Sequence, residues 1–272
     1  MFGIPTVRPI KSKPLPAQRV GRAALALARE TRALLIQSTM MHRDLSPSMP
    51  RDVAEGEPVV VVLHGLFATA GALRPLRRRI ELATGCRTGS FSYEPGCDLT
   101  TLVERLRGLL GTLPATSPID LVGHSMGGVV SRYYVQVGDG DPRVRQTISL
   151  ASPFRGSNIA KFVPDFFCHD LGPDSAVLHR LLRHHDRAAH IPHTSIASTH
   201  DQLVWPWHSA IYPHGRRVII SACGHNTLLF DPTVAEHVTR ALLHSSANPK
   251  SVSADHKMAR EPSARGSLPL AS

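Results

Sequence analysis

The chain has 272 residues, of which 42% are hydrophobic and 19% are charged, as in an ordinary globular domain and unlike a disordered chain. Its net charge of +10 could favour binding to an anionic partner. No basic motif with interleaved aromatic residues indicates that this partner is nucleic acid. No stretch is apolar enough to span a bilayer, and the apolar run at 23–28 is too short and starts too late for a signal peptide. A cytoplasmic protein is therefore expected by default.

Residues 1–50 are predicted to form a basic N-terminal arm that contains one helix. Eight lysines and arginines stand there against Glu30 and Asp44, so +6 of the net charge lies in this arm. A helix is predicted at 18–38 from a stripe that consists of Val20, Ala24, Leu27, Thr31, Leu34 and Leu35. The simplest interpretation of the arginines is a solvated face. The alternative is peripheral contact with an anionic membrane, which would make the protein membrane-associated.

Residues 51–244 alternate short strands with helices, which predicts an α/β domain with a mostly parallel central sheet flanked by helices. Strands are predicted at 59–63, 87–93, 119–122, 145–150, 194–197 and 218–221, and helices at 99–113, 127–137 and 232–243. Residues 157–193 form an insertion, with a short helix at 175–185, that is expected to act as a small cap or lid. Residues 245–272 have few bulky apolar side chains and predict a disordered tail.

A Gly-x-Ser-x-Gly motif follows the strand predicted at 119–122 and precedes a helix. Ser125 stands in it between Gly123 and Gly127, with His124 before the serine. A tight strand-to-helix turn lifts the serine hydroxyl above the sheet, and side chains two residues to either side would collide. Ser125 is therefore the predicted nucleophile, and Gly123, His124 and Gly127 complete the predicted nucleophile elbow.

The loop after the strand at 59–63 begins with His64 and Gly65. Acyl transfer needs two backbone N–H groups that point at the oxygen on which negative charge develops. One donor is expected from the residue after the nucleophile, Met126, and the other from this loop, at Leu66. His64 is expected to orient the loop rather than to act as the base.

A serine nucleophile also needs a histidine base and an acid that orients it. The chain has sixteen histidines, so the candidate base must be chosen by its position relative to the predicted strands. His225 follows the strand at 218–221, and Asp201 follows the strand at 194–197, in the order expected for an acid and then a base. The rival acids are Asp165, Asp170, Asp174 and Asp231, none of which directly follows a predicted core strand.

Five ordered blocks over residues 58–243 resemble the bacterial triacylglycerol lipases and esterases of the α/β-hydrolase fold. They read VVLHGLF, LVGHSMGG, SLASPFRGSNIA, STHDQLVWP and CGHNTLLFDP. The resemblance implies that fold, with Ser125, Asp201 and His225 as the triad and Leu66 and Met126 as oxyanion donors.

The chain departs from the family at one loop. Ser152 and Phe154 replace the threonine and histidine of the family's Thr-Pro-His-x-Gly-Ser segment, and a changed pocket wall is expected. Some members of the family hold a structural calcium ion, but no acidic cluster here suggests one, so neither a metal nor a cofactor is expected. The histidines of the insertion fit no common zinc spacing.

The predicted function is hydrolysis of a small-molecule or lipid ester with an apolar acyl chain, through an acyl-enzyme. The alternatives are an acyltransferase, a thioesterase, or a non-catalytic membrane-docking or interaction protein. Aromatic and apolar residues of the insertion could line an acyl pocket or form the core of the cap, namely Phe162, Val163, Phe166 and Phe167. Trp205 and Trp207 are expected to pack the loop that holds Asp201. The four cysteines, Cys86, Cys97, Cys168 and Cys223, form no Cys-x-x-Cys pair. Free thiols are the simplest interpretation, and a bond between Cys86 and Cys97 is the alternative that stays open.

Overall fold

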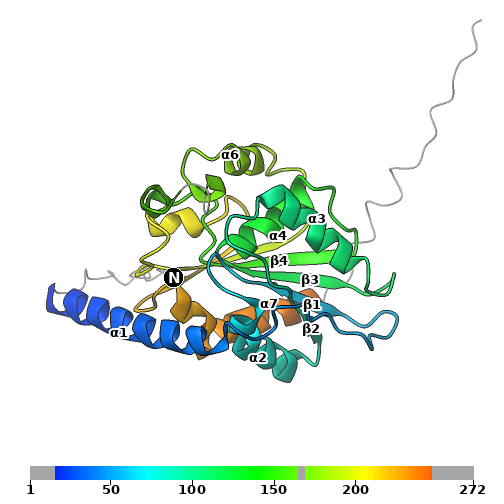
Figure 1. Cartoon of the computed structure of the whole chain (residues 1–272), viewed down its shortest axis with the longest axis horizontal. Coiled ribbons are helices and arrows are strands. Elements are labelled where there is room, and N and C mark those ends of the chain that lie inside the picture. Colours follow the sequence, from blue (N-terminus) through cyan, green and yellow to red (C-terminus); the bar gives the residue numbers. More distant parts are fainter. Residues whose placement is uncertain (1–15, 165–168, 247–272) are drawn as a thin grey trace, which may run out of the picture.

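A single sheet of six parallel strands forms the centre of the protein (Figure 1). The computed structural model describes residues 16–164 and 169–246. Within them the strand order is β2-β1-β3-β4-β5-β6, which confirms the predicted mostly parallel sheet. The strands are β1 (Val59–Leu63), β2 (Arg87–Gly89), β3 (Ile119–His124), β4 (Val144–Leu150), β5 (His193–Ser198) and β6 (Arg216–Ile220).

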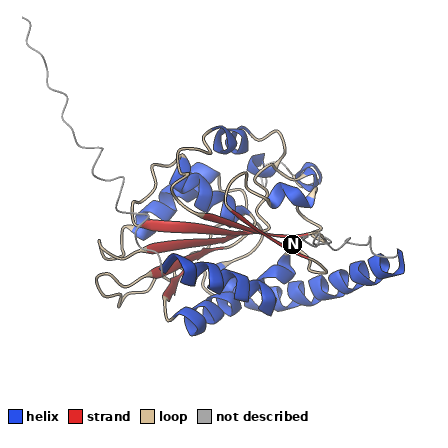
Figure 2. Cartoon of the chain, turned by 180° about the vertical axis from the view of Figure 1, so that it is seen from behind, coloured by secondary structure: helices blue, strands red, loops and turns tan. Residues whose placement is uncertain are grey.

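Helices cover both faces of this sheet (Figure 2). The α-helices are α1 (Pro16–Met40), α2 (Arg74–Thr84), α3 (Leu99–Leu110), α4 (Met126–Gln136), α6 (Ala176–Arg183) and α7 (Pro232–Ser246). Short 3-10 helices are η1 (Ala70–Leu73), η2 (Asn158–Phe162), η3 (His169–Leu171), η4 (Trp207–Ala210) and η5 (Asn226–Leu229). The two-sided cover explains the unbroken apolar run of β1, whose five side chains are fully buried.

Alternate residues of β1 belong to two separate cores. Val59, Val61 and Leu63 pack with apolar side chains of α3, α4 and α6. Val60 and Val62 pack with those of α2 and α7 on the opposite face. This alternation follows from the two-residue period of a strand.

One helix of the domain, α2, was not predicted from the sequence. It carries four arginines in eleven residues, and only Leu76 and Ile80 are buried. Two buried apolar positions are too few to produce a recognisable helical periodicity in the sequence.

The helix predicted at 18–38 is confirmed as α1, but the residues of its apolar stripe are exposed rather than buried in the core. Val20, Leu27 and Leu35 are 70%, 62% and 64% exposed. The buried side chains of α1 are instead Ala26, Glu30, Ala33 and Gln37. The two alanines allow a close approach, and α1 packs on η5 and η1.

The insertion at 157–193 carries η2, η3 and α6, and its described residues form no strand before β5. Phe162 is 85% exposed and Val163 is half-buried, whereas Asp165, Phe166, Phe167 and Cys168 lie outside the described residues. So do residues 1–15 and 247–272, which include most of the tail predicted to be disordered. Among the described cysteines, Cys86, Cys97 and Cys223 are free thiols. Across 16–164 and 169–246, no helix combines the length and apolarity needed to cross a membrane.

Candidate active site

Ser125 occupies a sharp turn between β3 and α4. Its backbone has φ 52° and ψ −122°, a conformation that non-glycine residues rarely adopt. Backbone hydrogen bonds hold the turn in place. Ser125 N–H donates to Leu150 O, at the end of β4, at 2.7 Å, and Gly128 N–H donates to Ser125 O at 3.1 Å. A strained serine fixed in this way is the geometry that the Gly-x-Ser-x-Gly motif predicts.

The glycines of the motif are required by contact distances. A Cβ atom on Gly123 would lie 2.2 Å from Gly128 N, and one on Gly127 would lie 2.5 Å from Leu63 O. A Cβ on Gly65, in the loop after β1, would lie 2.8 Å from the Cβ of Ser125. The loop after β1 therefore passes directly over the turn.

The predicted oxyanion donors lie on both sides of this contact. Met126 is the first residue of α4, so helix geometry leaves its N–H without an intrahelical partner. Leu66 follows Gly65 and lines the same pocket as Ser125. Their roles as donors remain predictions.

His225 and Asp201 form a buried pair at the ends of β6 and β5. His225 Nδ1 lies 2.9 Å from Asp201 Oδ2, and the histidine and aspartate side chains are 4% and 1% exposed. Asp201 Oδ1 also accepts hydrogen bonds from the N–H groups of Leu203 and Val204, each at 2.8 Å. The carboxylate thus fixes the ring and leaves His225 Nε2 for another partner.

The charges of this pair stabilise each other. Burial lowers the pKa of His225, but the charge and hydrogen bond of Asp201, together with Glu30, raise it above the ordinary histidine value. Burial raises the pKa of Asp201, but His225 and the two backbone N–H groups bring it below the usual aspartate value. Asp201 is therefore ionised at neutral pH.

Two other buried histidines, His64 and His124, hold loops of the site and are neutral at neutral pH. His64 stacks on Tyr93 at 3.7 Å, and its Nε2 accepts from Tyr93 N–H at 3.1 Å. His64 Nδ1 is then the protonated nitrogen and donates to Gly65 O at 2.7 Å. Burial lowers the pKa of His64 to about 4. His124 Nε2 donates to His225 O at 3.1 Å, and burial followed by the charge of His225 lowers its pKa to about 3.

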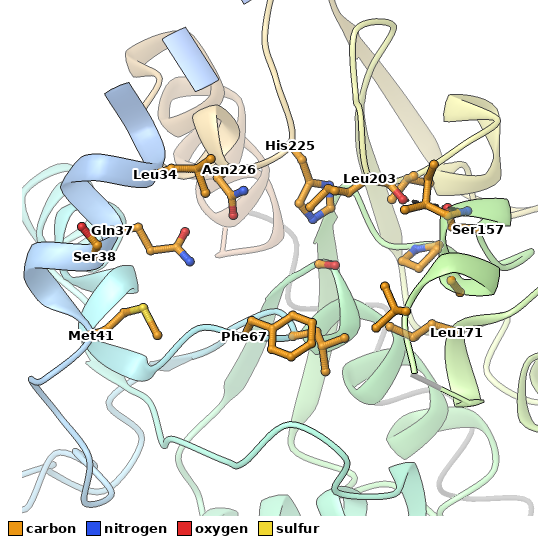
Figure 3. A pocket seen from close by; sticks show the side chains of 17 residues that line it. Leu34, Gln37, Ser38, Met41, Phe67, Ser157, Leu171, Leu203, His225 and Asn226 are labelled. Atoms are coloured by element: carbon orange, nitrogen blue, oxygen red, sulfur yellow. Dashed lines mark hydrogen bonds between the residues drawn. The ribbon is translucent and has the colours of Figure 1, made fainter. Parts of the chain in front are cut away.

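A pocket of about 490 Å³ connects Ser125 and His225. Figure 3 shows α1 residues on one side of it and Leu171, Leu203 and Ser157 on the other. The full lining is Leu34, Gln37, Ser38, Met41, Leu66, Phe67, Ser125, Pro153, Ser157, Ile159, Ala160, Val163, Leu171, Leu203, Val204, His225 and Asn226. Most of these side chains are apolar, and they come from α1, the insertion and the loops after β1, β4 and β5.

Comparison with known proteins places this geometry in a fold family. A sequence profile described as a PGAP1-like alpha/beta domain matches residues 99–184, which include β3, the turn at Ser125 and β4. The mature lipase BlEst2 of Bacillus licheniformis superposes with a TM-score of 0.58 at 15% identity, over 73% of this chain and 97% of that one. The chain has the α/β-hydrolase fold.

Two esterases share the α/β-hydrolase fold with this chain at similarly low sequence identity. Est1E of Butyrivibrio proteoclasticus has a TM-score of 0.55 at 16% identity, over 74% of this chain and 93% of that one. The metagenomic carboxyl esterase MGS0156 has a TM-score of 0.54 at 17% identity, over 74% and 77%. A search of curated protein sequences gave no significant match.

In this chain, the two departures from the family pattern at Ser152 and Phe154 do not change the pocket wall as expected. Both residues are fully buried and neither lines the pocket. Phe154 packs edge-on against His193 and Tyr212, with ring centroids 5.4 and 5.0 Å away. The wall at this loop is made by the neighbouring Pro153 and Ser157.

The loop after Asp201 is held to the insertion. Ser157 Oγ donates to Leu203 O at 2.7 Å and accepts from Trp205 N–H at 3.0 Å. Trp207 packs on the small core of this loop, as expected, whereas the side chain of Trp205 is 59% exposed. These contacts keep the Asp201 loop at the edge of the pocket.

The sequence did not indicate that α1 lines the site. Leu34 and Gln37 of α1, with Met41 directly after it, form one wall of the pocket although they precede the sheet in the sequence (Figure 3). Ala26 and Ala33 permit the close packing of α1, but the helix contains several other alanines, so the sequence did not single out this face.

Proposed function

We propose that this α/β-hydrolase is a serine hydrolase that cleaves carboxylic esters through an acyl-enzyme. The observation that supports this most directly is that Ser125, held in a strained turn, and His225, paired with Asp201, line one pocket. A nucleophile, a base and an acid that orients the base are the groups that acyl transfer needs. The fold by itself hosts many activities, so the proposal depends on these residues.

The proposed reaction has two halves. Ser125 Oγ attacks the ester carbonyl carbon while His225 Nε2 accepts the hydroxyl proton. The backbone N–H groups of Leu66 and Met126 hold the negative oxygen, and the alcohol leaves with the proton from His225. Water then attacks the acyl-enzyme, again giving its proton to His225, and the acid is released as Ser125 recovers its proton.

The acyl group is proposed to be apolar. The pocket wall next to Ser125 is built largely from leucine, valine, isoleucine, methionine and phenylalanine side chains. An alkyl chain placed there gains about 0.8 kcal/mol for each methylene that leaves water. Transfer of the acyl group to an acceptor other than water, or attack on a thioester, would use the same residues.

The test is hydrolysis of p-nitrophenyl esters from acetyl to palmitoyl, together with a fluorophosphonate probe. We expect hydrolysis that is fastest for a medium or long chain, and covalent labelling confined to the peptide that contains Ser125. Ser131 lies on the adjoining helix and serves as the internal control for labelling. A folded protein that hydrolyses no ester and takes up no probe would disprove the function.

A second proposal concerns where the enzyme finds its substrate. α1 exposes the apolar side chains of Val20, Leu27 and Leu35, and it also exposes Arg22 and Arg32. Apolar and basic side chains on one exposed helix favour the surface of an anionic membrane.

Vesicle sedimentation tests this contact, with the Ser125→Ala protein used so that no lipid is cleaved. We expect binding to phosphatidylcholine vesicles that contain phosphatidylglycerol, weaker binding in high salt, and little binding to phosphatidylcholine alone. The Leu27→Ser, Leu35→Ser double variant should bind more weakly. Equal binding by the parent and the double variant would contradict a role for α1.

A further inference from the structure

The side chain of Glu30 is buried beneath the segment that carries His225. Its Oε1 accepts hydrogen bonds from the backbone N–H and the side-chain amide of Asn226, each at 2.8 Å. Its Oε2 accepts from the N–H of Thr227 at 2.9 Å and from its hydroxyl at 2.8 Å. One carboxylate on α1 therefore satisfies four donors in the two residues that follow His225.

The residues before His225 are held by the same helix. A Cβ atom on Gly224 would lie 2.3 Å from Glu30 Oε2 and 2.8 Å from Glu30 Cβ, so only glycine fits there. The adjacent Arg29 donates to Ala222 O at 3.0 Å and forms an ion pair with Asp231. α1 thus binds the His225 segment on both sides of the histidine.

Other contacts on His225 come from different elements. Asp201 approaches Nδ1 from the loop after β5, and the ring of His124, at the end of β3, lies 4.7 Å away between centroids. Figure 3 shows Asn226 between His225 and Leu34 of α1. Among the residues that the structure describes, the charged and titratable groups that face His225 are Asp201, His124 and Glu30, and of these Glu30 alone comes from outside the sheet and its loops.

We propose that Glu30 is a positioning residue for His225: its carboxylate holds the backbone of residues 226 and 227, and so makes α1 a working part of the active site. The proposal rests on the proposed function, since positioning matters only if His225 is the base. Four charge-assisted hydrogen bonds to one short segment leave it little freedom. A displacement of His225 by about 1 Å would cost on the order of 10²-fold in rate.

If Glu30 only stabilised the fold, its replacement would not change the titration of His225. Glu30 also contributes negative charge near His225, which helps to raise the pKa of the imidazole. Removing that charge should lower the pKa, so that His225 stays neutral, and able to accept a proton, at a lower pH. Loss of an anchor alone would lower stability without moving this titration.

The experiment compares Glu30→Gln, Arg29→Met and Glu236→Gln. Glutamine keeps one acceptor oxygen but removes the charge and places an N–H₂ group against donors. Arg29→Met removes the other tether of the same helix, and Glu236→Gln makes the same charge change at an exposed site on α7. The readouts are kcat, KM, the pH profile of kcat/KM, and the imidazole titration of His225 by NMR, assigned with His225→Asn.

For Glu30→Gln we expect kcat to fall by about 10- to 100-fold, with KM little changed. The acid limb of kcat/KM and the NMR titration should both move to lower pH. Arg29→Met should leave the titration in place, and Glu236→Gln should match the wild type in every readout.

The proposal is overturned if Glu30→Gln keeps either the wild-type kcat or the wild-type titration of His225, or if Arg29→Met lowers both as much as Glu30→Gln does. It fails separately from the proposed function, because the titration does not depend on activity. Absence of any Ser125-dependent hydrolysis in the wild type would disprove the function, whereas an unmoved His225 titration in Glu30→Gln would disprove the role of Glu30.

Discussion

Alanine at position 125 is expected to lower kcat by on the order of 10⁶-fold for the preferred ester. The change removes the oxygen that would form the acyl-enzyme and nothing that the turn depends on. Ser125 holds its backbone through its N–H and C=O groups, which alanine retains. Alanine also has the same Cβ atom, so the close fit of Gly65 over the turn should persist. KM should therefore change much less than kcat.

The measurement is steady-state hydrolysis of the best p-nitrophenyl ester by purified wild type and Ser125→Ala, with equal melting temperatures as the folding check. Thr239→Ala removes a hydroxyl on α7 that does not line the pocket, and it should hydrolyse like the wild type. Activity of Ser125→Ala within about tenfold of the wild type would mean that a different group attacks the ester.

The turn at Ser125 and the Asp201–His225 pair could be predicted because both follow from strand ends. Parallel strands bring their carboxyl ends to one edge of the sheet, and β3, β5 and β6 end within a few residues of these three side chains. The hydrogen bond between His225 and Asp201 matches the partner chosen from position alone. The rival Asp170 instead accepts from Leu99 N–H, and Asp231 pairs with Arg29.

The role of α1 could not be predicted, because it depends on contacts between distant parts of the chain. Glu30 and Asn226 are 196 residues apart, and nothing in the period of α1 specifies that partner. Helical periodicity marks an apolar stripe, yet this helix buries the face that carries Ala26 and Ala33. Its leucines remain exposed or line the pocket.

At Phe154, too, the sequence alone could not predict which side chains line the pocket. The motif around it indicated a loop near the active site, and Pro153 and Ser157 do line the pocket. Which side of that loop faces the pocket was set by packing against Tyr212, a residue about sixty positions later. Local sequence identified the loop, and long-range packing decided which of its side chains the substrate would meet.

Asparagine at position 201 should lower kcat/KM by about 10⁴-fold near neutral pH. Its Oδ1 can still accept from Leu203 and Val204, so the loop should keep its shape. Its N–H₂ group would then face His225 Nδ1 and favour the tautomer with the proton on Nε2. That nitrogen could no longer accept the proton of Ser125.

The same variant tests the pH dependence. His225 must be neutral to act as the base, so activity is lost as pH falls through its pKa. Asp201 and Glu30 hold that pKa above the ordinary value of about 6.5, so the acid limb of the wild type should lie above it. Without the charge of Asp201, the residual activity should show an acid limb at lower pH. Asp174→Asn makes the same charge change at an exposed position and should leave the limb unmoved.

An acid limb above about 6.5 can be assigned to one histidine of the site. Burial lowers the pKa of His64 to about 4 and that of His124 to about 3, so neither changes charge in this range. His193 is also buried, with its pKa well below the usual value. A wild-type limb that stays in place in Asp201→Asn would thus belong to a group outside these residues, and the assignment of Asp201 and His225 as acid and base would be wrong.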